Sequence, residues 1–152
     1  MKIREFKTEL WLPLPPERVF LFFADAFNLE AITPPWLNFE VLTPAPIAMR
    51  EGTLIDYKLR IRGLPVRWRT CISAWEPPHR FLDEQLRGPY RLWIHEHTFE
   101  PCAGGTLCRD VVKYAVPFDF LIHEFLVRRD VEKIFAFRAE VLKKKFSNLT
   151  EK

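Results

Sequence analysis

The sequence predicts an α+β fold in which a curved antiparallel sheet of about seven strands grips one long C-terminal helix. Two short helices are expected after the first strand. Apolar and polar residues alternate through most of residues 53–114, which is the period of a half-buried strand. Segments rich in glycine and proline interrupt this alternation, as in an antiparallel meander. From Phe118 to Phe146 the apolar residues recur about every 3.6 positions, which is the period of a helix.

Length and composition favour one domain over residues 1–152, with one sizeable core. Hydrophobic residues make up 48% of the chain and aromatic residues 14%, which excludes wholesale disorder. A net charge of +3 does not indicate nucleic-acid binding. No apolar run approaches the ~18 residues of a membrane span. Three cysteines without a C-x-x-C motif argue against a disulfide framework and favour a cytoplasmic location.

The first elements follow from weak alternation and from prolines. Residues 3–12 alternate weakly and predict the first strand. A short helix is expected from Pro15-Pro16-Glu17 to about Asp25, because proline suits the first helical turn and an acidic side chain suits its positive end. Residues 27–32 predict a second short helix, which ends before Pro34-Pro35.

Residues 53–62 predict the clearest strand, with apolar side chains on one face and charged side chains on the other. We expect a type II′ turn at Gly63-Leu64, which pairs Leu59 with Trp68 and Tyr57 with Thr70. On the charged face this register sets Arg and Lys opposite one another, and such pairs repel. The charged face is therefore the hydrated one, and the apolar face lines the interior.

Further strands are expected at residues 80–87, 90–100 and 106–114. A four-residue connection before the first of them pairs Trp75 with Arg80, Ile72 with Asp83 and Thr70 with Gln85. In this register Asp83 and Gln85 point inward, whereas a slip of one residue would turn both outward.

Two histidines share a face of the next strand. Trp93, His95, His97 and Phe99 alternate with residues of the other face, and two aromatic side chains bracketing two histidines are unusual on a hydrated face. Asp110 lies opposite either His95 or His97, depending on the turn at Gly104-Gly105. A carboxylate beside an imidazole raises its pKa and can fix its tautomer.

These histidines admit three interpretations. His-x-His on a strand supplies two metal ligands, with Asp83 or Asp110 as a third. Two histidines are more often hydrogen-bonded polar residues, so we expect no metal and no cofactor. The His–Asp pair can transfer protons as a general acid and base, or it can simply order a pocket, and we favour the second.

Nine segments carry a family resemblance, which covers the chain from about Phe6 to Lys144. They are residues 14–20, 23–25, 32–37, 52–57, 68–70, 75–78, 88–93, 95–101 and 109–114. In these segments the chain resembles the SRPBCC superfamily (START/Bet v 1-like, helix-grip), which includes polyketide cyclases and lipid carriers. Within it, the chain is most similar to bacterial ligand-binding or cell-division-inhibitor-like proteins. The resemblance implies a helix-grip fold with a cavity between the sheet and the long helix, and it transfers no catalytic motif.

The sequence supports two functions in this cavity. The first is binding of a small hydrophobic or amphipathic ligand, such as a lipid, quinone or polyketide, without catalysis. The second is a metal-independent cyclase or dehydratase in which His95, His97 and Asp110 move protons, with Arg69 or Tyr90 polarising a carbonyl group. The only partner expected is the ligand, with no nucleic acid, no integral membrane association and no identified protein. The expected ligand-binding residues are Tyr57, Trp68, Asp83, Gln85, Tyr90, Trp93, His95, His97, Asp110 and Tyr114.

Overall fold

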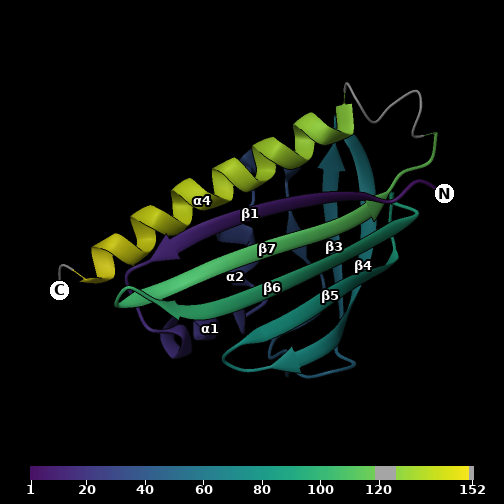
Figure 1. Cartoon of the computed structure of the whole chain (residues 1–152). Coiled ribbons are helices and arrows are strands. Elements are labelled where there is room, and N and C mark those ends of the chain that lie inside the picture. Colours follow the sequence, from purple (N-terminus) through teal and green to yellow (C-terminus); the bar gives the residue numbers. More distant parts are fainter. Residues whose placement is uncertain (119–125, 151–152) are drawn as a thin grey trace.

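The computed structural model describes residues 1–118 and 126–150, and in this part of the chain it shows one antiparallel sheet of seven strands. The strand order is β1-β7-β6-β5-β4-β3-β2, so the meander closes with β1 beside the last strand (Figure 1). This is the predicted α+β helix-grip arrangement. The strands are β1 (Arg4–Leu12), β2 (Glu40–Val41), β3 (Leu54–Ile61), β4 (Leu64–Glu76), β5 (Arg80–Arg87), β6 (Leu92–Cys102) and β7 (Gly105–Ala115).

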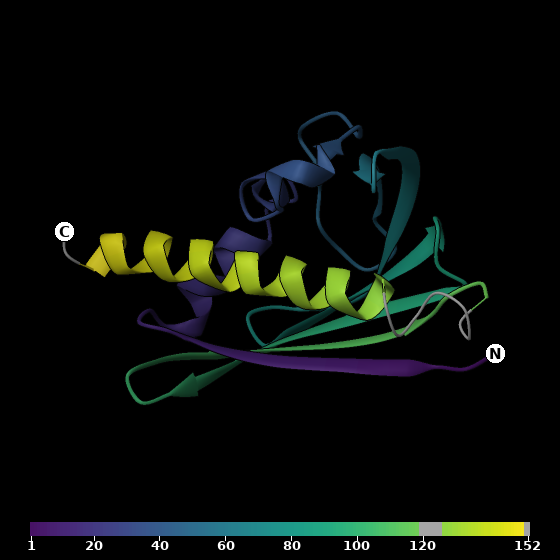
Figure 2. The ribbon, with the colours of Figure 1, turned by 90° about the horizontal axis from the view of Figure 1, so that it is seen from above.

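The helices lie on the concave side of the sheet, where β3 and β4 curve up beside them (Figure 2). They are α1 (Pro16–Phe23), α2 (Asn28–Ala31), the 3-10 turn η1 (Pro35–Leu37) and α4 (Arg128–Thr150). The ring of Phe20 in α1 contacts Phe81 and Phe99, at centroid distances of 5.9 and 5.4 Å. This aromatic core fills one end of the fold. Among the described residues no helix is both long and apolar enough to cross a membrane.

Phe118, where the apolar period predicts the long helix to begin, is not helical. Phe118 has a positive φ of 54° and lies in a turn, and α4 begins at Arg128. Residues 119–125, which the prediction placed in the same helix, lie outside the described residues. The helix buries Val131, Phe135, Leu142 and Phe146 against the sheet, as its period of about 3.6 residues requires.

The β3–β4 hairpin turns one residue earlier than expected. Its two central residues are Arg62 and Gly63, with φ values of 51° and 81°, as a type I′ turn requires. The predicted turn at Gly63-Leu64 is wrong because it assigned the glycine to the first central position. Tyr57 therefore pairs with Trp68, two residues from the predicted partner. A shift of two residues preserves the face of every side chain, so the interior assignment holds.

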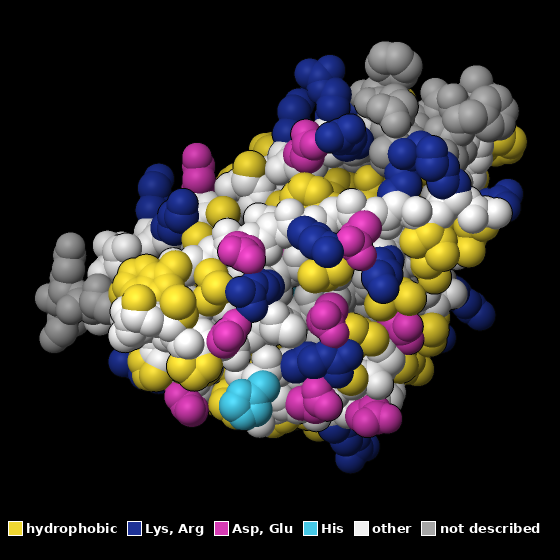
Figure 3. All heavy atoms as spheres, viewed as in Figure 1, with side chains coloured by type: hydrophobic (Ala, Val, Ile, Leu, Met, Phe, Trp, Pro, Cys, Tyr) yellow, Lys and Arg dark blue, Asp and Glu magenta, His cyan; other side chains and the backbone are white. Residues whose placement is uncertain are grey.

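Acidic partners on the outer face of the sheet offset the like charges that the sequence places there. Arg69 donates two hydrogen bonds to Asp56, of 2.8 and 3.1 Å, and Lys58 lies 3.0 Å from Glu40. Figure 3 shows basic and acidic side chains interspersed over the face seen in Figure 1. This is the hydrated face, and Arg69 lies on it and not in the interior.

We expect Asp56→Asn to lower the free energy of unfolding by less than about 1 kcal/mol, because exposed ion pairs contribute little. The Arg69 and Asp56 side chains retain 38% and 41% of their exposure, so water competes for both groups. Urea denaturation of both proteins measures the difference. A loss above 2 kcal/mol would contradict this account.

The β4–β5 register carries the pairs that place Asp83. Ile72 pairs with Asp83 and Thr70 with Gln85, as predicted. Nearer the connection the prediction is wrong by one residue, since Trp75 pairs with Phe81 and not with Arg80. The register shift between Ile72 and Ala74 is the cause, because a bulge adds one residue to β4 alone.

Candidate ligand cavity

A cavity of about 740 Å³ lies between α4, the short helices and the inner face of the sheet. This volume is within the range of small-molecule sites, which is about 300–1,000 Å³. Most of the residues that line the cavity are apolar or aromatic. Among the charged and imidazole side chains in the lining, four lie close together, on β5, β6 and α4. Apolar and aromatic lining residues include Leu29, Phe39, Met49, Ile55, Tyr57, Leu59, Trp68, Tyr90, Trp93 and Phe135, and the four polar residues are Asp83, His95, His97 and Arg138.

Three aromatic rings form one wall of the cavity. The ring of Trp68 lies 5.5 Å from Trp93 and 5.6 Å from Tyr90, and Tyr90 lies 4.7 Å from Trp93. In edge and tilted contacts of this kind, the rings hold one another in place and present a large apolar surface, at a low cost in conformational entropy. Tyr114 packs behind this wall, 6.2 Å from the Trp93 ring, and the described cavity lining does not include it.

Two aspartates and two histidines form a closed cluster, which we call the His–Asp cluster (Asp83, His95, His97 and Asp110). His95 Nε2 lies 2.7 Å from Asp110 Oδ1, and His97 Nε2 lies 2.7 Å from Asp83 Oδ2. The second ring nitrogens face the other carboxylates, with His97 Nδ1 3.3 Å from Asp110 and His95 Nδ1 3.7 Å from Asp83. Both histidines therefore contact Asp110, which resolves the alternative left open by the sequence.

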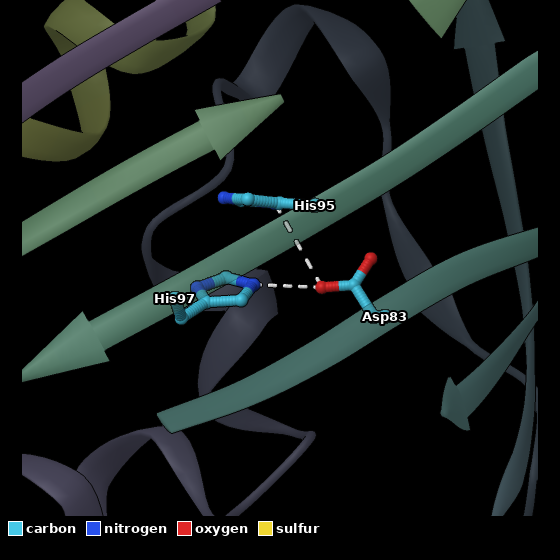
Figure 4. Close-up of side chains that lie close together, drawn as sticks. All are labelled: Asp83, His95 and His97. Carbon is cyan, nitrogen blue, oxygen red and sulfur yellow. Dashed lines mark hydrogen bonds and ion pairs between the residues drawn. The ribbon is translucent and has the colours of Figure 1, made fainter. Parts of the chain in front are cut away.

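Figure 4 shows the cavity side of this cluster, with Asp83 on β5 facing both imidazoles of β6. The imidazoles stack on one another with centroids 3.7 Å apart. Phe81 stacks on the free face of His97 at 4.0 Å, and Phe135 of α4 meets His95 at 5.4 Å. Packing on both sides leaves little rotational freedom, and the histidine side chains are only 5% exposed.

Burial and the neighbouring charges set the protonation of the cluster. Burial opposes the charge on His97, but its hydrogen bonds to Asp110 and Asp83 outweigh this and raise its pKa. For His95, burial and the nearby charge of His97 prevail and lower the pKa. Burial alone would raise the pKa of Asp110, yet the hydrogen bonds from His95 and His97 lower it. Burial likewise opposes ionisation of Asp83, but the hydrogen bond from His97 lowers the pKa of this carboxyl group. Both carboxylates are therefore ionised at neutral pH.

Arg138 of α4 adds a positive charge to the cavity beside the His–Asp cluster. Its guanidinium lies over the Phe135 ring at 5.0 Å and interacts with the charges of Asp83 and Asp110. Burial lowers its pKa. Its Nε–H is buried and has no hydrogen-bond partner among the described residues. A buried donor without a partner is costly, so this group is suited to bind an acceptor oxygen in the cavity.

Our sequence interpretation missed Arg138, although the sequence holds a signal for it. Positions 131, 135, 138, 142 and 146 follow one face of a helix, and four of them carry buried apolar side chains. An arginine at the central position of such a face is anomalous. It indicates either a charge partner or a ligand inside the fold.

Gln85, predicted to contact ligand, uses its side chain on the backbone instead. Its Nε2 donates to the Tyr90 carbonyl oxygen at 2.7 Å, and its Oε1 accepts from the Tyr90 N–H at 3.2 Å. A side chain at Gly88 would meet Gln85, because a Cβ there would lie 2.3 Å from Oε1. Gln85 therefore positions the loop that carries Tyr90. Seven of the expected ligand-binding residues line the cavity, namely Tyr57, Trp68, Asp83, Tyr90, Trp93, His95 and His97. Asp110 reaches it only through the histidines.

We expect Gln85→Leu to lower the free energy of unfolding by about 1–3 kcal/mol, because two hydrogen bonds to partly buried backbone are lost. Urea denaturation measures this loss. Leu86→Gln is the control, since Leu86 is exposed on the next position of the same strand. Equal stabilities of the two variants would show that the Tyr90 loop does not depend on Gln85.

A model of the family described as polyketide cyclase / dehydrase and lipid transport matches residues 12–139. Comparison with curated proteins gives no significant match. Protein CV1439 from Chromobacterium violaceum has a similar structure, with a TM-score of 0.74, 18% identity, and coverage of 94% of this chain and 97% of that one.

Two further structures are similar in fold at low identity. The Zhui aromatase/cyclase from Streptomyces sp. R1128 has a TM-score of 0.74 at 15% identity, covering 96% of this chain and 94% of its own. The major latex-like protein 151 from Panax ginseng has a TM-score of 0.71 at 8% identity, covering 95% and 97%. At identities this low, the structural similarity establishes the shared helix-grip fold alone. The nature of the ligand has to be argued from the cavity.

Proposed function

Because this chain belongs to the polyketide cyclase / dehydrase and lipid transport family of the SRPBCC superfamily, we propose that it binds a small amphipathic molecule, without catalysis. One observation carries the proposal. The cavity of about 740 Å³ is lined mostly by apolar and aromatic side chains, and Arg138 and the His–Asp cluster supply adjoining polar groups. A site of this composition binds the apolar part of a ligand by burial and orients it through a few polar contacts.

The polar end of the ligand is expected to be a carbonyl or carboxylate oxygen. Arg138 can only donate hydrogen bonds, and its buried Nε–H has no partner among the described residues. The aromatic wall of Trp68, Tyr90 and Trp93 offers rings for stacking. A planar ring system that carries a carbonyl group, such as a quinone or an aromatic polyketide, satisfies both features better than a saturated acyl chain.

Native mass spectrometry of the purified protein, followed by extraction of any bound molecule, tests the proposal directly. Titration with a naphthoquinone and with a long-chain fatty acid, followed by tryptophan fluorescence, compares the two ligand classes. We expect quenching by the quinone, because Trp68 and Trp93 line the cavity. Trp93→Leu is expected to weaken binding about tenfold or more, whereas the outer-face variant Arg69→Gln keeps wild-type affinity. An empty protein that binds neither probe would contradict the proposal.

A second candidate is acid–base chemistry of the cyclase or dehydratase type, which one contact favours. His95 Nε2 lies 2.7 Å from Asp110, so its Nδ1, on the side of Asp83 and the cavity, is the atom that would accept a proton. In this candidate Arg138 or Tyr90, which both line the cavity, would polarise the carbonyl group, and Arg69 on the outer face would not. Exchange of solvent deuterium into an acidic C–H of a 1,3-diketone, followed by NMR, tests this candidate. It requires exchange faster than in buffer alone, with the acceleration lost in His95→Gln and unchanged by a chelator.

A further inference from the structure

The cavity side of the His–Asp cluster presents three donor atoms to one point. They are Asp83 Oδ2, His97 Nε2 and His95 Nδ1, and all lie within 4.8 Å of one another (Figure 4). Asp83 Oδ2 lies 2.7 Å from the first nitrogen and 3.7 Å from the second. Atoms bound to one zinc ion lie about 3–4 Å apart, because each bond is about 2.0–2.2 Å long. Small rotations of these side chains are sufficient to surround one ion.

Asp110 contacts both imidazoles on the side away from Asp83, and we call it their outer partner. Its Oδ1 lies 2.7 Å from His95 Nε2 and 3.3 Å from His97 Nδ1, the two nitrogens that do not face Asp83. Metal-binding histidines donate the other ring N–H to a carboxylate, which fixes the tautomer and strengthens the ligand. His97 Nε2 donates a hydrogen bond to Asp83 at 2.7 Å, so a metal ion bound here would replace that proton. With both outer nitrogens donating to Asp110, both inner nitrogens would then offer their lone pairs to the same ion.

From this geometry we infer that Asp83, His95 and His97 form a binding site for a divalent transition-metal ion, with Asp110 as the outer partner of both histidines. Two imidazole nitrogens and one carboxylate oxygen suit zinc and its first-row neighbours better than magnesium or calcium. The three ligand residues line the cavity, so the remaining coordination position faces the space for the small molecule. Although the sequence led us to expect no metal, the β5 register sets Asp83, one of the two third ligands that the sequence offered, opposite His95.

The positive charge of Arg138 is expected to lower the affinity of this site for a metal ion. Its charge acts on both Asp83 and Asp110, so it repels a divalent ion bound between the same groups. A ligand that brings an anionic oxygen to Arg138 would relieve that repulsion. We therefore expect the metal alone to bind more tightly to Arg138→Met than to the wild type, by about tenfold. This inference does not rest on the proposed ligand function, because the metal is tested without any ligand.

Titration of the chelator-treated full chain with Zn²⁺ by calorimetry tests the site, and the absorption spectrum with Co²⁺ identifies the ligands. We expect one ion per chain, with affinity reduced at least tenfold in Asp83→Asn and in His97→Gln. His79→Gln and Cys102→Ser are matched controls, because both residues are exposed, just before β5 and at the end of β6, and neither is part of the described cavity lining. Thiolate absorption with Co²⁺, or affinity lost in a control variant, would overturn the assignment.

A measurement on the wild-type protein removes any dependence on the folding of the variants. Imidazole nitrogen signals of all four histidines can be followed by NMR as Zn²⁺ is added. We expect the signals of His95 and His97 to shift together at one equivalent, with His79 unchanged. No Zn²⁺ binding in the micromolar range, or shifts confined to other histidines, would overturn the inference.

Discussion

Replacing Arg138 with methionine is expected to weaken binding of a carbonyl- or carboxylate-bearing ligand about 10- to 100-fold. A hydrogen bond from a charged donor contributes about 1.5–3 kcal/mol, which corresponds to this range. Methionine fills a similar volume and retains contact with Phe135, so the packing of α4 against the sheet persists. Fluorescence titration with the naphthoquinone measures the change in Kd, and circular dichroism confirms the fold.

Arg129→Met is the matched control for this prediction. Arg129 lies on the same helix, but its side chain is exposed and is not part of the described cavity lining. Both variants lose one positive charge, so a general electrostatic effect would weaken binding equally in each. Only a direct contact at Arg138 predicts weak binding in one variant and wild-type binding in the other. Unchanged affinity in Arg138→Met would contradict the proposed orientation of the ligand.

The faces of the strands could be predicted from the sequence more reliably than their partners. The register of the β3–β4 hairpin differs from the prediction by two residues. The reason is that Arg62 adopts a positive φ, whereas the predicted turn begins with glycine in that conformation. Tyr57 and Trp68 nevertheless line the cavity as expected, since an even shift keeps each side chain on its face. The bulge in β4 had only a local effect, and Asp83 still points inward opposite Ile72.

The chemistry of the site depends on side-chain contacts that the alternation of apolar and polar residues along a strand does not predict. Opposite pairing on β6 and β7 sets His97 across from Asp110, yet the shorter contact of Asp110 is the diagonal one to His95. Which atoms meet across a sheet depends on rotamers and twist. Arg138 comes from α4, which follows the whole sheet in the chain, and only tertiary packing brings it to the cluster. Its place on an apolar stripe was the one local sign of it.

The His–Asp cluster is expected to be the most sensitive polar part of the fold. We expect Asp110→Asn to lower the free energy of unfolding by about 3–5 kcal/mol, the typical effect of removing one partner from a buried charge pair. In this variant His97 loses one of the two carboxylates that hold its charge. Urea denaturation of the chelator-treated proteins measures the loss. Asp56→Asn makes the same chemical change at an exposed pair, and it should cost less than about 1 kcal/mol.

Acid titration of the same variants separates the electrostatic account from a packing defect. The pKa of Asp110 is lowered in the folded state, so its contribution is present above the unfolded value and is lost as the pH falls through the folded value. The wild type is therefore expected to lose stability steeply below about pH 5, and Asp110→Asn less steeply. His97 acts in the opposite direction, because its raised pKa gives stability that is lost as the pH rises above about 6.5. Asp110→Asn should flatten both limbs, whereas a packing defect would lower the whole curve and leave its shape unchanged.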